Sequence, residues 1–359
     1  MARVRVRKGM PSVALDKAEF ARRVRQRFCD PAFDSLQVEI GKIIDAAWDG
    51  YDNSRKAPRT RRAGPGFADP GYELSVEWIA TRDAVRRAQQ RQKSPTSKSR
   101  ILLINSSPRN DQTCPGEISK TYRLVKIAEE IFRSERGFEL ELLDLSNLTS
   151  EYGRRIHSCK SCVSTAMPLC HWPCSCYPNH SLDQVNDWMA DIYPMWAAAH
   201  GVMIVTPVHW YQAPTTLKSM IDRLVCADGG NPDPSSTSGK DPQKAKDLET
   251  KGWPYPRHLA GRAFSVVVHG DAAGAETLRR SLVDWLSDIG LIGAGRQAEI
   301  DRYIGYYEPY AGSHIALDRD TALQEETRNA ARALVRAVKL LRRGRLERPD
   351  AALKDPRPK

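Results

Sequence analysis

Three short apolar runs stand out in the middle of the chain, at residues 101–104, 202–205 and 264–268. Runs this short and this continuous are typical of parallel strands that are buried on both faces. Each run breaks into a polar loop, and apolar positions three or four apart follow, which predicts a helix after every loop. We therefore expect an α/β fold in which three loops emerge at the carboxyl edge of one parallel sheet. Doubly wound folds bind their ligands at that edge.

Further elements follow from the same alternation of apolar and polar positions. Residues 139–144 are expected to form a second strand, and residues 318–343 a long last helix. Residues 89–99 contain no apolar side chain, which is typical of a linker. Helices are also expected at residues 16–27, 33–48 and 72–89, a loop rich in proline and glycine at residues 54–66, and an insertion at residues 229–253.

The N-terminal helices have small apolar faces. Val76, Trp78 and Ile79 are too few to form an independent core. We therefore expect this region to pack on the α/β body or on a second subunit, and we predict a homo-oligomer. The predicted domains are a basic helical extension with its linker at residues 1–98, an α/β domain at residues 99–343 and a basic tail at residues 344–359.

The first loop, at residues 105–113, has the chemistry of a phosphate site. It joins a strand to a helix, so free backbone N–H groups and the helix dipole point at its contents. Ser106, Ser107 and Thr113 add hydroxyl donors, and the Arg109 guanidinium can form two hydrogen bonds to a phosphate. The loop lacks the glycines of the dinucleotide and P-loop motifs, which favours a single phosphate monoester. The alternative is a strand–turn–helix with a polar loop that binds nothing.

The second loop offers flat aromatic surface. Trp210 and Tyr211 lie between Pro207 and Pro214, which make the backbone rigid. A ligand with one phosphate and one large planar ring would satisfy the first two loops together.

Three motifs in this order resemble the NAD(P)H-dependent FMN reductase family of flavodoxin-like proteins. They are Ser-Ser-Pro-Arg-x-x-x-Thr at 106–113, Thr-Pro-Val-x-Trp at 206–210 and Leu-Lys-x-x-Ile-Asp-Arg-Leu at 217–224. The resemblance covers about residues 100–343 and implies a flavodoxin-like three-layer sandwich with a five-stranded parallel sheet. It also implies FMN as cofactor and NAD(P)H as co-substrate. The chain departs from the usual Gly-Ser-Pro-Arg in having Asn105 and Ser106 at the start of the first motif.

The resemblance assigns roles to side chains of all three loops. It places the FMN phosphate at the first loop, the isoalloxazine ring at the second and the far side of that ring at the third. The implied residues are Ser107, Arg109, Thr113 and Cys114 for the phosphate; Pro207, Val208, His209, Trp210 and Tyr211 for the ring; and Gly270 and Asp271 for its far side.

Five of the eight cysteines lie within residues 159–176. No export signal is readable, so a disulfide framework is not expected, and thiolates at such spacing suit a tetrahedral zinc or an iron–sulfur cluster. The predicted ligands are Cys159, Cys162, Cys170 and Cys174, with Cys176 as the spare. Iron–sulfur flavoproteins, a branch of the same superfamily, resemble this chain in the place of their cysteine motif, although their spacing is tighter. The alternative is a loop of free thiols.

The net charge of +11 is carried by the two ends of the chain. Residues 1–100 hold 22 Lys and Arg against 12 Asp and Glu, and residues 337–359 hold 8 against 3. Basic ends can contact acidic partners, but no base-reading motif is present and nucleic-acid binding is not expected. No apolar stretch is long enough to span a membrane, and we expect a cytoplasmic protein.

No catalytic triad or carboxylate pair is visible, so no catalytic side chain is predicted, as expected where a cofactor carries the reaction. The chain is interpreted as an FMN-dependent NAD(P)H oxidoreductase that reduces a small electron acceptor such as a quinone or a flavin. One alternative is a flavin electron-transfer protein, with or without an iron–sulfur cluster, that has no nicotinamide activity of its own. Another is a flavodoxin-like scaffold without cofactor whose basic ends bind a partner.

Overall fold

The computed structural model describes residues 14–113, 116–306 and 308–346. Its main sheet is parallel, with strand order β4–β3–β5–β6. Strands β7 and β8 pair with successive parts of the outer edge of β6 and so share the fifth position. The predicted α/β fold with a five-stranded parallel sheet is confirmed. The strands are β3 (Ser99–Asn105), β4 (Phe138–Asp144), β5 (Gly201–Pro207), β6 (Ala263–Gly270), β7 (Ile292–Gly293) and β8 (Glu299–Tyr303).

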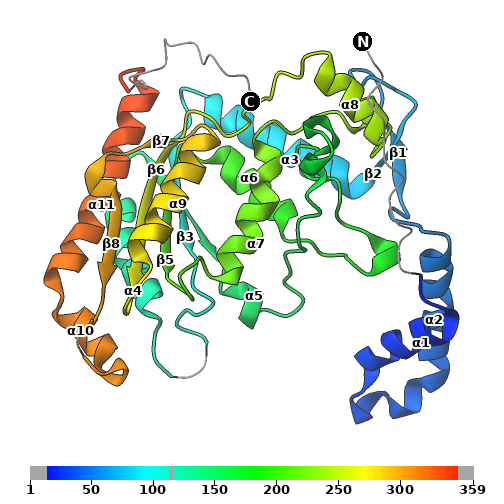
Figure 1. The fold of residues 1–359 in the computed structure, drawn as a ribbon, viewed down its shortest axis with the longest axis horizontal. Helices are drawn as coiled ribbons and strands as arrows, with labels where there is room; N and C mark the ends of the chain where they lie inside the picture. Colours follow the sequence, from blue (N-terminus) through cyan, green and yellow to red (C-terminus); the bar gives the residue numbers. More distant parts are fainter. Residues whose placement is uncertain (1–13, 114–115, 307, 347–359) are drawn as a thin grey trace.

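Two layers of helices cover the sheet, which gives a three-layer sandwich (Figure 1). On one face, α4 (Lys120–Ser134) and α11 (Thr321–Arg342) pack on the strands, with α10 (Ser313–Arg319) preceding α11. The opposite face is covered by α3 (Val76–Lys93), α6 (Met189–Ala198), α7 (Thr215–Arg223) and α9 (Ala275–Asp288). The short helices α5 (Asn147–Ser150) and α8 (Pro242–Thr250) lie in the connections after β4 and α7.

Helix α3 belongs to the core of the α/β body. Val85 and Ala88 are buried in the same cluster as the apolar side chains of β3 and α6. The predicted start of this helix at residue 72 was wrong, because β2 (Glu73–Ser75) pairs with β1 (Thr60–Arg62) in the segment expected to be a loop. Val76 was expected in the apolar face, but it is the first helical residue and is 43% exposed.

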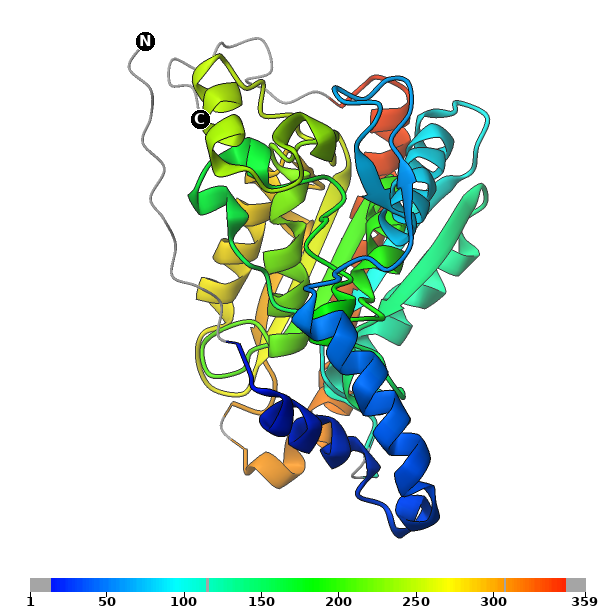
Figure 2. The ribbon, with the colours of Figure 1, turned by 90° about the vertical axis from the view of Figure 1, so that its right-hand side faces the viewer.

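Helices α1 (Lys17–Arg25) and α2 (Gln37–Asp52) project from the rest of the molecule (Figures 1 and 2). They pack on each other through the rings of Phe20, Trp48 and Tyr51. Their contact with the body is made by α2 and the turn at residues 180–182. No helix in the described ranges is long and apolar enough to cross a bilayer.

Candidate functional site

The first loop gathers hydroxyl groups at the N-terminus of α4. The Ser106 hydroxyl is buried and has no hydrogen-bond partner in the part of the chain that the structure describes. The Ser107 Oγ accepts a hydrogen bond of 3.1 Å from the Arg109 backbone N–H, and the Ser119 Oγ lies 3.3 Å from it. Ser119 caps α4 by accepting from the Tyr122 N–H. The loop therefore presents buried hydroxyls beside the positive end of a helix dipole.

Asp144, at the end of β4, holds this loop in shape. Its carboxylate accepts hydrogen bonds from the side-chain amides of Asn105 at 2.7 Å and Asn110 at 3.0 Å. The Thr113 Oγ1 accepts from the Asn110 N–H at 2.9 Å, so this hydroxyl shapes the loop. The Arg109 Nη2 donates to the Glu117 carbonyl at 2.6 Å. Cys114 lies outside the described residues.

The second loop places two aromatic rings in solvent. His209 and Gln212 exchange two backbone hydrogen bonds of 2.9 Å, which closes a two-residue turn. Both residues at its tip have positive φ, as in type I′ turns, 47° for Trp210 and 66° for Tyr211. Their exposures are 94% and 63%. Val208, which follows Pro207, donates its N–H to the His269 carbonyl at 2.8 Å, so this loop begins next to the third one.

The third loop packs closely on the second. A Cβ added to Gly270 would lie 3.5 Å from the Val208 Cγ2, and one added to Gly274 would lie 3.0 Å from the Tyr211 Cα. Gly274 also has a φ of +90°, which side chains rarely adopt. Asp271, between these glycines, forms an ion pair with the buried Lys120 ammonium at the start of α4. This ion pair joins the third loop to the first.

Several side chains at this edge were missed by the sequence analysis. The Lys120 ammonium lies 5.3 Å from the ring centroid of Tyr310, which is 75% exposed. His269 is buried, its Nε2 lies 2.8 Å from the Thr121 Oγ1, and burial lowers its pKa to about 3, so the ring is neutral at neutral pH. Burial likewise lowers the pKa of His209. Lys120 could have been found from its position directly after a helix cap; Tyr310 follows β8 and carries no such signal.

The cysteine loop brings different thiols together from those predicted. The Cys162 Sγ lies 3.5 Å from the Cys176 Sγ and 3.7 Å from the Lys240 Nζ. The Cys170 thiol hydrogen-bonds with Cys226, and this contact, together with burial, raises its pKa. Among the described residues, no group of three or more Cys, His, Asp or Glu side chains is arranged to hold a metal. The four predicted ligands therefore do not form one site in this structure, and metal binding stays a prediction.

Cys162 is expected to be a reactive thiol. The hydrogen bond from Cys176, and then the Lys240 ammonium, lower its pKa to about 6 against the opposing effect of burial. Alkylation of Cys162 by iodoacetamide should therefore be fast at pH 7 and slow down as the pH falls through about 6, where the thiolate takes up a proton. Peptide mass spectrometry across pH measures this rate. Cys176→Ala should move the midpoint upward, and an unchanged midpoint would contradict the assigned contact.

Comparison with known proteins identifies similar chains. Residues 99–301 match the family described as NADPH-dependent FMN reductase. An iron-sulfur flavoprotein of Methanosarcina thermophila is 29% identical over 126 residues, which are 35% of this chain and 52% of the relative. The chain thus matches about half the length of that curated relative.

Solved structures were also matched. RosB with a bound 8-demethyl-8-formylriboflavin-5′-phosphate intermediate has 13% identity and a TM-score of 0.48 over 69% of this chain and 82% of its own. An FMN-dependent NADH-azoreductase from Bacillus anthracis in complex with FMN has 13% identity and a TM-score of 0.38 over 66% of this chain and 99% of its own.

Proposed function

Because this chain belongs to the NADPH-dependent FMN reductase family, we propose that it holds FMN at the carboxyl edge of its sheet and passes electrons from NAD(P)H to a small acceptor such as a quinone or a flavin. The observation that carries the proposal is the buried Ser106 hydroxyl without a partner in the described ranges, beside the Ser107 and Ser119 hydroxyls. Leaving a buried polar group unsatisfied costs free energy, and a phosphate oxygen would accept its hydrogen bond. The donors therefore fit an anion with several acceptor oxygens.

The phosphate would be held by side chains and by the helix end. We assign Ser107, Arg109 and Thr113 to it, with Cys114 adjacent in sequence, and we add Ser106 and Ser119. Arg109 and Lys120 supply positive charge at the first turn of α4, where the helix dipole has the same sign. The glycine-poor loop leaves room for one phosphate, which favours FMN over FAD.

The ring would lie against the second and third loops, at Pro207, Val208, His209, Trp210 and Tyr211 on one side and Gly270 and Asp271 on the other. When bound, FMN supplies the acceptance and delivery of electrons. The protein's part is to orient the ring and to shield it from water. Trp210 and Tyr211 support this assignment, because exposing large rings on a left-handed backbone is costly and is typical of functional sites.

A second function, electron transfer by a flavoprotein, is favoured by two observations. The curated relative that is 29% identical is named an iron-sulfur flavoprotein, and this chain carries five cysteines in one loop. The chain would then be an electron-transfer flavoprotein without nicotinamide activity. Steady-state oxidation of NADPH and of NADH by the FMN-loaded protein, with a quinone as acceptor, separates the two functions. Turnover supports the reductase. If dithionite reduces the bound flavin but NADPH and NADH do not, the result supports the electron carrier.

Arg109→Ala is expected to weaken FMN binding by about 1.5–3 kcal/mol, which is roughly 10- to 150-fold in Kd, because a charge-assisted contact to the phosphate is lost. Quenching of flavin fluorescence on titration measures the Kd. The matched control is Arg123→Ala in the first turn of α4, the helix that follows the loop, where the guanidinium pairs with Asp318. Equal FMN affinities in wild-type protein and the Arg109 variant would contradict the phosphate site.

A further inference from the structure

The sheet has an open edge at β4. This strand pairs with β3 on one side, and no described strand pairs with its other side. Six of its seven residues are partly exposed, and Leu143 is the buried one. Figure 2 shows β4 as the teal strand at the margin of the molecule. Such an edge presents unpaired backbone N–H and C=O groups that a further strand can bind.

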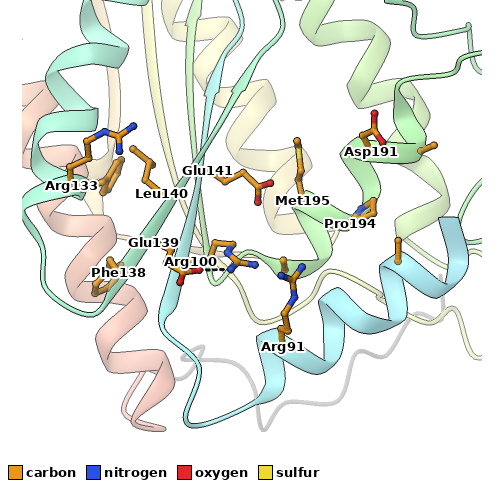
Figure 3. Close-up of a pocket in the computed structure, with 14 residues that line it drawn as sticks. Arg91, Arg100, Arg133, Phe138, Glu139, Leu140, Glu141, Asp191, Pro194 and Met195 are labelled. Carbon is orange, nitrogen blue, oxygen red and sulfur yellow. Dashed lines mark hydrogen bonds and ion pairs between the residues drawn. The ribbon is translucent and has the colours of Figure 1, made fainter. Parts of the chain in front are cut away.

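A groove of about 750 Å³ runs beside this edge (Figure 3). Arg91 of α3 and Asp191, Pro194 and Met195 of α6 line it opposite β4. Phe132 and Arg133 of α4, in the opposite helix layer, line it as well, so the groove extends around the outer side of the strand and leaves that side accessible.

Side chains alternate along β4. Leu143 belongs to the core under α3 and α6, so Glu139 and Glu141, of the same parity, face that layer. Phe138, Leu140 and Leu142 pack instead on the core under α4 and α11. The edge thus carries an acidic row on one face and an apolar row on the other.

The charges of this edge are only partly balanced. Arg100 forms an ion pair with Glu139, and Arg133 of the groove forms one with Glu129. Glu141 has no ion-pair partner among the described residues. Pairing with the β4 strand of a second copy would not balance this charge. In the antiparallel register centred on Leu140, Glu139 lies opposite Glu141, and in the register centred on Glu141, two copies of that residue lie opposite each other. The edge instead suits a strand that alternates basic and apolar residues.

Such an alternation stands at the beginning of the chain, in Arg3-Val4-Arg5-Val6-Arg7. We propose that the β4 edge is the docking surface for residues 3–7 of a second copy of this chain. With Arg5 opposite Glu141, Val4 and Val6 stand opposite Leu140 and Leu142 in either strand direction. Arg5 and one outer arginine (Arg3 in the parallel direction, Arg7 in the antiparallel one) then lie opposite glutamates, and the other outer arginine lies opposite Leu143.

The donor is assigned to a second copy because of where the described chain begins. It begins at Ala14, just before α1, and α1 and α2 project from the body (Figure 1). The segment from α1 to the end of α2 leaves apolar side chains in solvent, with Leu36 42%, Val38 68% and Ile43 50% exposed. Apolar surface of this kind is typical of a contact between subunits. Exchange of two such N-terminal segments gives a closed, two-fold symmetric dimer.

The test uses charge reversal in the full-length chain, with mass measured by light scattering on a size-exclusion column. Arg5→Glu and Glu141→Arg should each raise the dimer dissociation constant about tenfold or more, since each places like charges opposite one another at both symmetric contacts. Glu130→Arg is the matched control, because Glu130 is exposed on α4 and does not line the groove. It should leave the dimer unchanged.

Mixing the two variants decides the proposal. An equimolar mixture of the Arg5→Glu and Glu141→Arg chains offers opposite charges at both contacts, so dimers should re-form on mixing, which also shows that both variants are folded. The chain with both substitutions should dimerise like wild type. A monomeric wild-type protein, dimers that resist both reversals, or a mixture that stays monomeric would each overturn the proposal.

Discussion

Arg223→Ala is expected to lower the free energy of unfolding by about 3–5 kcal/mol, because it leaves a buried carboxylate without its counter-charge. The Arg223 side chain is 1% exposed, and its guanidinium donates to both Asp187 oxygens, at 2.6 and 2.9 Å. It also donates to the His157 carbonyl at 2.9 Å and lies 4.5 Å from the ring centroid of Tyr177. One side chain on α7 thus holds both ends of the cysteine loop. Urea unfolding followed by circular dichroism measures the loss.

Lys218→Ala is the matched control, because Lys218 lies on the same helix and pairs with Asp222 in solvent. Exposed pairs of this kind contribute about 0–1 kcal/mol. Similar losses in the two variants would mean that Arg223 is not the anchor of the loop. An Arg223 variant of wild-type stability would mean the same.

A chain that starts at Ser99 is expected to lose cooperative folding. It lacks α3, whose Val85 and Ala88 are buried in the core of the α/β body and whose Trp78 and Ile79 are buried against the segment of β1 and β2. It also lacks the hydrogen bond of 2.9 Å from the Trp78 Nε1 to the Pro173 carbonyl. Each large apolar side chain left in solvent or missing from its site costs about 1.5–3 kcal/mol, and the sum approaches the total stability of a typical domain. Thermal unfolding by circular dichroism checks this.

A chain that starts at Asn53 separates the roles of the N-terminal helices. It removes α1 and α2 but keeps β1, β2 and α3. This shorter deletion should melt cooperatively and retain FMN, and it should be monomeric because residues 3–7 are gone. If the chain that starts at Ser99 melts with the same midpoint as the longer one, α3 is not part of the core.

The sequence predicted the sheet well because of burial on both faces. The runs at residues 101–104, 202–205 and 264–268 are continuous since helix layers cover both sides of β3, β5 and β6. The edge strand β4 has a polar, alternating sequence for the opposite reason, and its alternation was sufficient to predict it. Residues 60–62 and 73–75 were not predicted as strands, because three-residue strands carry almost no periodic signal.

Contacts between residues that are far apart in the chain could not be predicted from the sequence. Spacing gave Cys159 and Cys162 as natural partners, but the loop doubles back and brings Cys176 to Cys162 across fourteen positions. The ion pair of Lys120 with Asp271 joins residues 151 positions apart. Such pairs depend on how the loops close on one another, and no local pattern encodes that closure.

Asp144 gives the edge strand a second role. It is the last residue of β4, and its carboxylate fixes Asn105 and Asn110 in the phosphate loop. A strand added to β4 would restrict the motion of β4, and the Asp144 carboxylate at the end of β4 holds the phosphate loop in shape. Subunit association and FMN binding would then be thermodynamically linked, and linkage is reciprocal: whatever factor FMN adds to the dimerisation constant, dimerisation adds to the affinity for FMN. The flavin content of a sample would then rise with protein concentration.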